Sequence, residues 1–283
     1  MLDCKNETKV YTFPRPIGFD LYQIFDCGQS FRFVLGENGS FFGIAHGKYI
    51  EVFQNDDEVT IIGSDKNDFE KIWKKYFSLD IDYALIRDDI VRIRPNDNVL
   101  SEAMEYGKGI RLLKQDKWET LCSFIISQNN NIPRIRSLIE ALSEKYGEQI
   151  TFNGKTYYSF PDAKTVASVG VDALRELKVG FRAPYIIDAA SKVSSGEIDL
   201  DEIDLLPTDE LLNKLMTIKG VGLKVASCVS LFAYGRLDSF PIDVWIKRVL
   251  EKYYPEGFDH TILGNTAGLV QQYLFYYERY RKS

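Results

Sequence analysis

The spacing of apolar residues changes after Gly63, and this change restricts the fold more than any other feature of the sequence. Before Gly63, short runs rich in Phe, Tyr, Val and Ile suit β-strands: KVYTFP, SFRFVL, SFFGIA, KYIEVF and EVTIIG. Turn sequences such as GENG and QNDD separate them. The first sixty or so residues are therefore expected to form an antiparallel sheet whose strands are joined by hairpins.

Almost everything after Gly63 has the periodicity of amphipathic helices. Asp65 or Asp68 is expected to cap the first of them, at residues 68–77. Further helices are expected at residues 82–90, 118–128, 133–147, 181–193, 209–218, 223–235, 243–254 and 263–280. The turn sequence FNGK predicts a small hairpin within this helical region.

The predicted fold class is α+β. We expect an N-terminal antiparallel β-sheet domain with flanking helices at residues 1–103, packed on a helical body at residues 104–283.

Composition limits the chemistry that this fold can perform. His46 and His260 are the only histidines, so histidine metal sites and Ser-His-Asp triads are nearly excluded. Four widely scattered cysteines suit reduced thiols better than a disulfide framework. No apolar run approaches the roughly 18 residues of a membrane span, and the N-terminus has no apolar signal region. We expect a soluble, cytoplasmic monomer, nucleoid-associated if bacterial, whose reactive groups are Lys, Asp, Cys, amides or backbone.

Charge is unevenly distributed along the chain. The formal net charge of -6 argues mildly against a polyanionic partner, so any DNA site must be a local patch. Residues 197–210, the acidic segment, hold seven acids and no base, which is typical of a solvated face. Residues 211–250 hold six bases against two acids, and the motif described next lies there.

Residues 211–235 predict two helices joined by a tight turn at Lys219-Gly220-Val221-Gly222, with the second helix beginning at about Leu223. The two glycines permit positive φ and close backbone approach, and the N–H groups that begin the new helix are free to hold an anion. Such a helix-hairpin-helix, here at about residues 208–235, grips DNA phosphate without reading sequence. An ordinary tight turn between two helices is the alternative.

Lys224 lies in the first turn of the second predicted helix. The positive end of the helix dipole disfavours a further positive charge there, which makes free amine available for attack on carbon and formation of a Schiff base. The alternative is a surface lysine that binds phosphate. Asp243 is well placed as the N-cap of a later helix, the commonest role of an isolated Asp, and its carboxylate could also face Lys224 and an oxocarbenium-like sugar.

At this point the sequence resembles the helix-hairpin-helix DNA glycosylase superfamily, and within it the 8-oxoguanine DNA glycosylase/AP lyases. The matching blocks are CGQSFRF (27–33), SQNNNIPRI (127–135), GFRAPY (180–185), KGVGLKVASC (219–228), FPIDV (240–244) and QQYLF (271–275). Their order and spacing match from about residue 10 to the C-terminus. The NNN triplet, the GQSFR block and the Lys/Asp pair are more specific than the hairpin alone.

The resemblance implies a bifunctional base excision repair enzyme whose partner is double-stranded DNA with 8-oxoguanine opposite cytosine. The damaged base would be flipped into a pocket, as attack on a glycosidic bond within a duplex requires. Lys224 would attack C1′ and displace the base, while Asp243 would stabilise the developing positive charge. The Schiff base would then support β-elimination and nicking 3′ to the lesion.

The resemblance also assigns a base pocket. Gly28 would offer its carbonyl to the N7–H that 8-oxoguanine has and guanine lacks, and Gln271 would bond the Watson–Crick edge. Cys228 and Phe275 would sandwich the base, although both residue types are common in plain cores. Cys228 lies four residues after Lys224, hence on the same helical face, which favours the pocket.

On the DNA side, Asn129 would fill the hole left by the flipped base and Phe181 would wedge into the stack. Arg134 and Arg182 would read the orphaned cytosine. The alternative for the run of three asparagines is a polar loop before a helix, and the alternative for the two arginines is contact with phosphate. Eukaryotic relatives have Tyr at the wedge, so Phe181 predicts looser discrimination of the opposite base.

Other contacts implied by the resemblance lie at the hairpin and beside Asp243: Lys219, Gly220, Gly222 and Trp245. Trp245 stands where eukaryotic relatives have His, which removes one phosphate contact or local electrostatic role. No cofactor is expected to be required. A structural monovalent or calcium-like ion is expected on the backbone carbonyls of Met216, Ile218 and Val221.

Three other interpretations remain. The endonuclease III and adenine-mismatch branches usually carry a [4Fe–4S] cluster near the C-terminus, but no cysteine follows Cys228. The alkylated-base branch shares the fold and the Asp but generally lacks the lysine, so a dispensable Lys224 would favour it. A noncatalytic DNA-binding module would bind every lesion without cleaving any.

Overall fold

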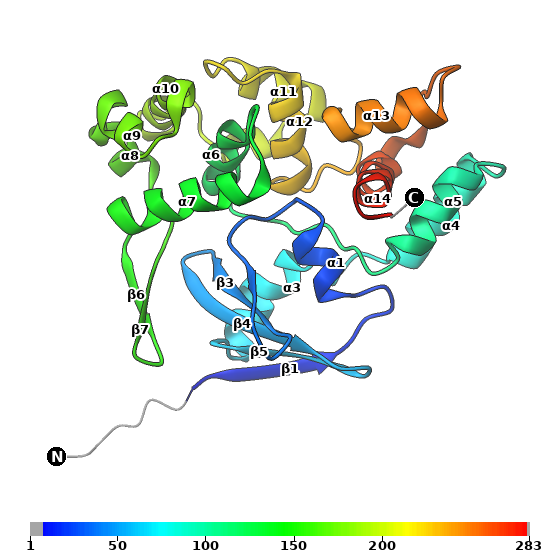
Figure 1. Ribbon diagram of the computed structural model, residues 1–283, viewed down its shortest axis with the longest axis horizontal. Helices are drawn as coiled ribbons and strands as arrows, with labels where there is room; N and C mark the ends of the chain where they lie inside the picture. The colour runs from blue at the N-terminus through cyan, green and yellow to red at the C-terminus, as the bar shows by residue number, and fades with distance from the viewer. Residues whose placement is uncertain (1–7, 282–283) are drawn as a thin grey trace.

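The computed structural model describes residues 8–281 and places a five-stranded antiparallel sheet below a body of helices (Figure 1). The α+β prediction is confirmed. The sheet has the strand order β1-β5-β4-β3-β2. Its strands are β1 (Val10–Pro14), β2 (Val34–Leu35), β3 (Phe41–Ala45), β4 (Lys48–Gln54) and β5 (Glu58–Ile62).

Hairpins join β2 to β3, β3 to β4 and β4 to β5, as predicted. The first strand differs, because β1 pairs with β5, with Phe13 opposite Val59. The run SFRFVL forms strand only at Val34–Leu35, so the longer strand expected there is wrong. Phe33 is instead buried, and its ring stacks on Phe25 with centroids 4.1 Å apart.

The prediction of β structure throughout the first sixty residues is also wrong at α1 (Leu21–Asp26). Asp20 caps this helix by accepting a hydrogen bond from the N–H of Gln23. Leu21, Ile24 and Phe25 have helical spacing, and all three are buried in the core of the sheet domain.

Helices occupy most of the chain after Gly63, as predicted. Asp65 is the capping residue of the first one, because its carboxylate accepts the N–H of Asp68. The sequence did not predict α5, α8 or α9. The elements are α2 (Lys66–Asp68), η1 (Phe69–Trp73), α3 (Lys74–Tyr76), α4 (Tyr83–Ile93), α5 (Asn98–Tyr106), α6 (Lys117–Ser127), α7 (Ile132–Tyr146), α8 (Ala163–Val169), α9 (Val171–Glu176), η2 (Gly180–Arg182), α10 (Ala183–Ser194), η3 (Glu202–Leu205), α11 (Thr208–Met216), α12 (Leu223–Phe232), α13 (Val244–Tyr253), η4 (Thr261–Thr266) and α14 (Ala267–Tyr280).

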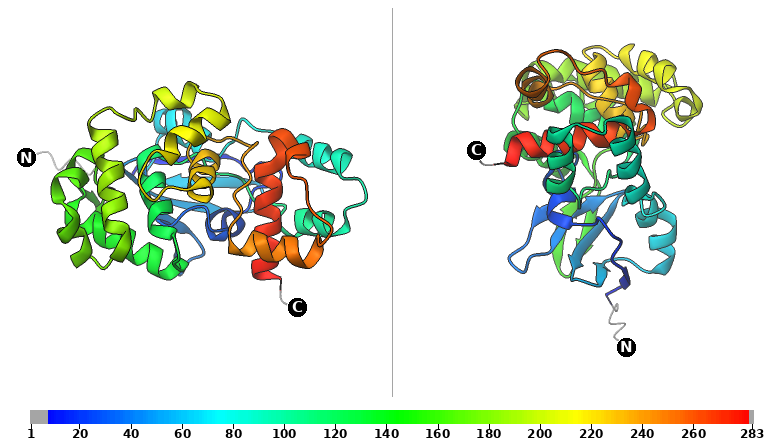
Figure 2. Two further views of the ribbon diagram at one scale, coloured as in Figure 1. Left: turned by 90° about the horizontal axis from the view of Figure 1, so that it is seen from above. Right: turned by 90° about the vertical axis from the view of Figure 1, so that its right-hand side faces the viewer.

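The molecule has one core that packs the sheet against α1, η1 and α3, and a second, larger core among the helices. The right-hand view of Figure 2 shows most of the helices above the sheet. Helix α12 is central, since every residue from Val225 to Phe232 is buried. Tyr83 of α4 and Leu100 of α5 belong to the core of the helical body. The domain boundary near residue 103 stays a prediction.

The predicted FNGK hairpin is confirmed as β6 (Gln149–Phe152) and β7 (Lys155–Tyr158). Aromatic rings join it to the sheet, because Tyr49 of β4 lies 4.4 Å from the ring centroids of both Phe152 and Tyr157. In the part of the chain that the structure covers, no helix is long and apolar enough to cross a membrane. Cys4 lies outside the described residues; Cys27, Cys122 and Cys228 are free and buried.

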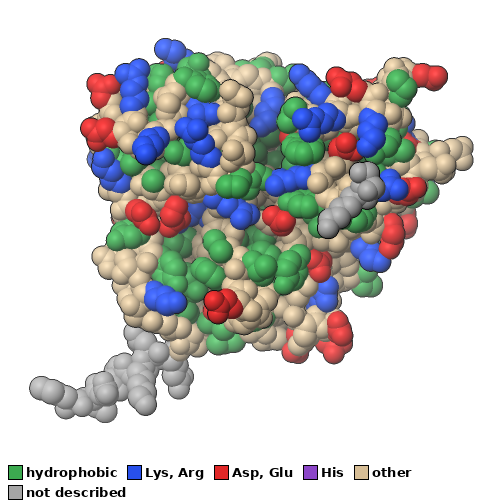
Figure 3. All heavy atoms as spheres, viewed as in Figure 1, with side chains coloured by type: hydrophobic (Ala, Val, Ile, Leu, Met, Phe, Trp, Pro, Cys, Tyr) green, Lys and Arg blue, Asp and Glu red, His purple; other side chains and the backbone are tan. Residues whose placement is uncertain are grey.

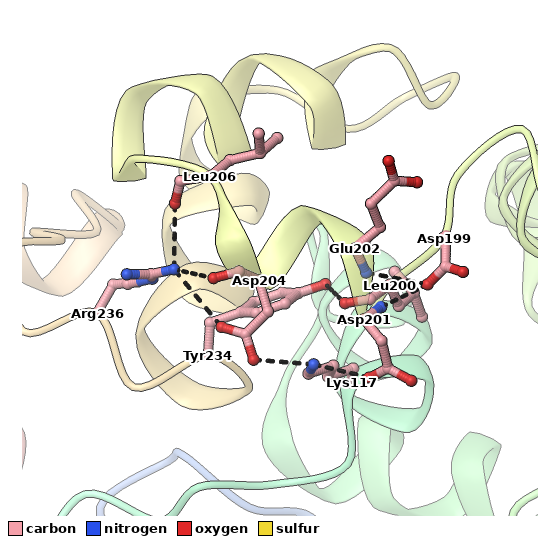
Figure 4. Close-up of polar contacts among 9 residues, drawn as sticks. All are labelled: Lys117, Asp199, Leu200, Asp201, Glu202, Asp204, Leu206, Tyr234 and Arg236. Atoms are coloured by element: carbon pink, nitrogen blue, oxygen red, sulfur yellow. Dashed lines mark hydrogen bonds and ion pairs between the residues drawn. The ribbon is translucent and has the colours of Figure 1, made fainter.

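The acidic segment is only partly the solvated face that its sequence suggests. Asp201 has a side chain that is 92% exposed, whereas that of Asp204 is 28% exposed. Figure 4 shows both carboxylates on Lys117, at 2.8 and 2.9 Å, while Arg236 donates to backbone carbonyls of the same segment. The Lys117 contacts anchor the segment to the first residue of α6, at the end of that helix opposite Ser127, and Arg236 anchors it to the loop after α12.

Candidate active site

The tight turn between α11 and α12 has the geometry of the predicted hairpin. Gly220 has φ +76°, and a side chain there would overlap the ring of Tyr185, so glycine is required. The backbone N–H of Lys219 donates to Asp188 at 2.8 Å, which fixes the turn against α10. Helix α12 begins at Leu223, as predicted, and no side chain caps it.

Lys224 is half-buried on the first turn of α12. Its Nζ lies 3.4 Å from Oγ of Ser127, the last residue of α6. The Ser127 hydroxyl donates to the carbonyl of Phe124 at 2.8 Å, so it accepts from the amine. The amine also lies 5.5 Å from the Phe124 ring centroid. Two contacts from α6 therefore hold the amine in place, one with the Ser127 hydroxyl and one with the Phe124 ring.

Asp243 caps α13, as predicted. Its Oδ1 accepts the N–H groups of Trp245 and Ile246, at 3.0 and 2.9 Å. Both bonds go to one oxygen, so Oδ2 is the oxygen available to a substrate. The two amides fix the orientation of the carboxylate at the positive end of the helix dipole.

Lys224 and Asp243 line one cleft of about 890 Å³. Figure 3 shows a hollowed surface on the helical half, with Lys and Arg side chains gathered around it. The cleft brings together these sequence-predicted site residues: Gly28, Asn129, Gly222, Lys224, Cys228, Asp243, Trp245, Gln271 and Phe275.

The predicted base pocket is built by backbone as much as by side chains. Gly28 has φ +79°, and a Cβ there would lie 3.1 Å from Cζ of Phe275, so only glycine lets the backbone meet this ring without strain. Burial raises the pKa of Cys228 to about 11, although the Lys224 charge acts in the opposite direction. The thiol is therefore neutral at physiological pH, as a surface that packs on a base requires.

Gln271 supplies an unsatisfied polar group in the cleft. It is buried, yet its Oε1 has no hydrogen-bond partner among residues 8–281. A buried acceptor without a donor costs about 1–3 kcal/mol. A ligand with N–H groups would remove this cost.

The three asparagines before α7 have separate roles. Asn131 caps α7 by accepting the N–H of Arg134, and Asn130 donates to the Ile126 carbonyl at 3.1 Å. Asn129 is exposed in the left-handed region at φ +49° and lines the cleft. All three asparagines line the cleft, and Asn129 is the one that neither caps α7 nor donates to the Ile126 carbonyl.

The predicted wedge and the two arginines lie beside this loop. The Phe181 side chain is 52% exposed, as a wedge requires. Arg182 is buried, and its guanidinium donates to the carbonyls of Gln128 and Asn129. Arg134 is exposed and makes one long contact, 3.4 Å, to the Lys178 carbonyl. The cleft does not include Phe181, Arg134 or Arg182.

The remaining predicted contacts lie at the surface of the hairpin and α13. Lys219, Gly220 and Gly222 are exposed, and Trp245 is half-buried with Arg248 4.8 Å above its ring. The Ile218 carbonyl is one of the three expected to hold an ion. It accepts the N–H of Val221 at 3.0 Å and keeps a second lone pair for a ligand.

Sequence reasoning missed Ser127, Phe124 and Arg279, which also line the cleft. Arg279 follows Gln271 and Phe275 at intervals of four residues, so helical spacing could have found it. Ser127 and Phe124 contact Lys224 from a helix about a hundred residues earlier, and no local pattern indicates that contact.

Comparisons with known proteins identify the family. Residues 13–121 match the 8-oxoguanine DNA glycosylase N-terminal domain, and residues 122–261 match the HhH-GPD superfamily of base excision DNA repair proteins. A probable N-glycosylase/DNA lyase of Methanothermobacter thermautotrophicus is 31% identical over 212 residues, which cover 65% of this chain and 68% of the relative.

Two solved structures share the fold over nearly the whole chain. MBOgg1, in complex with a low affinity DNA ligand, has a TM-score of 0.90 and 41% identity, covering 96% of this chain and 98% of that one. The 8-oxoguanine glycosylase/lyase of Clostridium acetobutylicum, in complex with DNA containing cytosine opposite 8-oxoguanine, has a TM-score of 0.88 and 36% identity, covering 95% and 97%. The chain belongs to the 8-oxoguanine DNA glycosylase family of base excision repair proteins, the N-glycosylase/DNA lyases.

Proposed function

We propose that this enzyme excises 8-oxoguanine from duplex DNA with Lys224 as the nucleophile and then cleaves the strand through a Schiff base. The observation that carries the proposal is the shared cleft, in which Lys224 and Asp243 face the same space as Gln271 and Phe275. The relative from Clostridium acetobutylicum was solved with cytosine opposite 8-oxoguanine, which supports the same substrate here.

The reaction begins when the damaged nucleotide leaves the helix and enters the cleft. The neutral amine of Lys224 attacks C1′, the C1′–N9 bond breaks, and the base departs with the bonding electrons and then takes up a proton. The carboxylate of Asp243 stabilises the positive charge that develops on the sugar. Loss of an amine proton and opening of the sugar ring give a Schiff base between C1′ and Nζ.

Strand cleavage follows from the Schiff base. The iminium carbon acidifies the C2′ proton, a base removes it, and the C3′–O bond breaks by β-elimination. The 3′ phosphate leaves, and hydrolysis of the conjugated imine restores Lys224. A monofunctional glycosylase that activates water would leave no covalent bond to the protein at any stage.

Recognition of the base uses the pocket walls. The Gly28 carbonyl accepts the N7–H of 8-oxoguanine, and the unpaired Oε1 of Gln271 accepts an N–H of the Watson–Crick edge. Phe275 and the neutral thiol of Cys228 pack on the two faces of the ring. Guanine presents a bare N7 to the same carbonyl, so two acceptors meet and repel.

On the DNA side, Asn129 occupies the space left by the flipped base and Phe181 wedges into the stack. Arg134 and Arg182 read the orphaned cytosine. Because Arg182 donates to the carbonyls of Gln128 and Asn129 in the free protein, it reads cytosine only after exchanging those bonds.

Phosphate binding is assigned to the hairpin, at Lys219, Gly220 and Gly222, and Trp245 at the start of α13 is a further DNA contact. The exposed turn and the start of α12 support this at Gly220 and Gly222, because no side chain of the described residues caps that helix. Asp188 already accepts the Lys219 N–H, and Asp243 accepts that of Trp245. The carbonyls of Met216, Ile218 and Val221 are neutral oxygen ligands that suit a monovalent or calcium-like ion, which would order the turn. We place the enzyme with the DNA of the cytoplasm, as a monomer that requires no cofactor.

Borohydride trapping tests the proposal. The protein and Lys224→Gln are each incubated with a duplex that holds one 8-oxoguanine opposite cytosine. A covalent adduct that disappears in the variant is the expected result. Base release without an adduct would indicate a monofunctional glycosylase, and binding without release on any lesion would leave a noncatalytic module.

A further inference from the structure

Arg279 lines the cleft although no step of excision uses it. Helix α14 presents Gln271, Phe275 and Arg279 on one face, four residues apart, and all three reach the same cleft. The guanidinium carbon lies 5.8 Å from the Phe275 ring centroid and 4.9 Å from that of Tyr280. The cation therefore stands at the edge of the predicted base pocket.

Over residues 8–281, no carboxylate forms an ion pair with Arg279, in contrast to its charged neighbours in sequence. Glu278 pairs with Lys252 at 3.2 Å, and Arg281 pairs with Glu102 at 3.1 Å. The Arg279 side chain is half-buried between aromatic rings. A cation that is partly removed from water without an anionic partner retains hydrogen-bond donors for a ligand.

Gly28 places this cation relative to the base. A Cβ on Gly28 would lie 3.6 Å from Nη1 of Arg279 and 3.1 Å from Cζ of Phe275. The guanidinium is thus beside the backbone that meets the N7 edge of the base. The C8 carbonyl oxygen of 8-oxoguanine is bonded to the atom next to N7, so a base with N7–H on Gly28 presents O8 close by.

We propose that Arg279 is a specificity-determining residue that donates a hydrogen bond to the C8 carbonyl oxygen of the extruded base. The inference rests on the proposed function, because it requires 8-oxoguanine in this cleft. Guanine has C–H at C8, so it offers no acceptor and leaves the guanidinium unpaired. A charge-assisted bond is roughly twice as strong as a neutral one, so this contact adds to a Gly28 bond that is weak alone.

The competing role for Arg279 is a contact to DNA phosphate. A phosphate contact supports every lesion equally, because it carries no information about the base. An abasic site in the same duplex separates the two roles, since it has all the phosphates and no base. Strand cleavage at that site also proceeds through Lys224, so both measurements use the same nucleophile.

The experiment compares Arg279→Leu with the unmodified protein on two duplexes, one with 8-oxoguanine and one with an abasic site, each opposite cytosine. Removing O8 recognition is expected to lower kcat/KM for excision about 10- to 100-fold. Cleavage of the abasic site is expected to stay within about twofold. Arg279→Lys, which keeps a cationic donor, is expected to recover part of the excision rate.

Lys247→Ala is the matched control, because Lys247 is an exposed cation that lines the same cleft from α13. Its loss is expected to weaken both reactions together, as for a phosphate contact. Thermal melting of each variant checks the fold, and Arg279→Gln replaces the leucine variant if that variant melts early.

Equal losses of Arg279→Leu on both duplexes would assign the residue to phosphate, and unchanged excision would remove it from recognition. Either result would overturn the inference. Failure of the unmodified protein to excise 8-oxoguanine while it cleaves the abasic site would instead overturn the proposed substrate.

Discussion

The guanidinium of Arg182 donates to the main-chain oxygen of Asn129 at 3.0 Å, from a side chain that is 4% exposed. It also donates to the carbonyls of Gln128 and Val179. Asn129 has φ +49°, a left-handed conformation that costs free energy and needs support from its surroundings. Arg182 thus holds the loop that presents Asn129 to the cleft.

Arg182→Ala is expected to lower the free energy of unfolding by about 2–4 kcal/mol, because several buried carbonyls lose a charged donor. Excision is expected to fall at least tenfold opposite every base, since the Asn129 loop loosens. Thermal melting and single-turnover excision opposite C, T and A measure both effects. Arg134→Ala, at an exposed position, is the control and is expected to alter opposite-base preference without changing stability.

A loss of activity for Arg182→Ala confined to cytosine, with melting unchanged, would contradict the loop-holding role. It would leave reading of the orphaned base as the only function of that side chain.

Gly28→Ala is expected to lower excision of 8-oxoguanine about tenfold while abasic-site cleavage continues. The new Cβ meets Cζ of Phe275 at 3.1 Å, which pushes the ring from its place against the base. Alanine at φ +79° also adds strain of about 1–2 kcal/mol. Gly47→Ala is the matched control, because Gly47 has φ +69° with nothing within 4 Å of a Cβ among the described residues.

Gly47→Ala should lose about as much free energy of unfolding as Gly28→Ala and keep full activity. Urea unfolding and excision rates measure the two effects. If Gly28→Ala and Gly47→Ala both excise normally, the contact between Gly28 and Phe275 does not shape the pocket.

Glu119 predicts a pH dependence of stability. Burial raises the pKa of this carboxyl to about 7, Arg32 opposes the shift, and nearby Asp116 and Glu140 add to it. Because the folded pKa lies above the ordinary value of 4.5, the stabilising contribution is complete below about pH 4.5. It is lost as pH rises through about 7, when the folded protein must hold a buried charge.

Glu119→Gln is therefore expected to gain stability relative to the unmodified protein as pH rises, by up to about 3 kcal/mol between pH 4.5 and 8. Urea unfolding at pH 5 and pH 8 measures the difference. Glu144→Gln, which changes an exposed carboxyl on α7, is the control and should track the unmodified protein. If the free energies of unfolding of Glu119→Gln and of the unmodified protein changed in parallel with pH, the Glu119 carboxyl would ionise normally.

Local rules predicted the parts of the site that depend on neighbours in sequence. The start of α12, the place of Lys224 on its first turn and the Asp243 cap all follow from glycine, dipole and capping chemistry within a few residues. Long-range contacts did not follow in this way. Gly28 and Phe275 meet across almost the whole chain, and only the resemblance to a family placed them together.

Burial explains most of what the sequence did not predict. Arginine is usually found at the surface, yet packing of η2 against the Asn129 loop buries Arg182. Helix α1 was missed because its apolar residues lie between β-like runs and the helix is only six residues long. The pairing of β1 with β5 joins two strands that no hairpin connects, so no turn sequence specifies it.

Ser127 tests how the nucleophile is held. Its hydroxyl donates to the Phe124 carbonyl and accepts from Nζ of Lys224 at 3.4 Å, which directs the amine toward the cleft. Ser127→Ala is expected to slow borohydride trapping about 2- to 10-fold, the loss of one neutral hydrogen bond, with KM for DNA unchanged. Ser127→Thr keeps the hydroxyl and is expected to restore the rate.

Ser123→Ala, one turn earlier on α6, is the control, because Ser123 is buried but does not line the cleft. Two results would mean that Ser127 supports the end of α6 and not the amine. One is a Ser127→Thr variant that stays as slow as Ser127→Ala, and the other is a Ser127→Ala variant whose KM for DNA rises. A rate restored by threonine alone ties the amine to the hydroxyl, since threonine adds bulk to the helix while it keeps the acceptor.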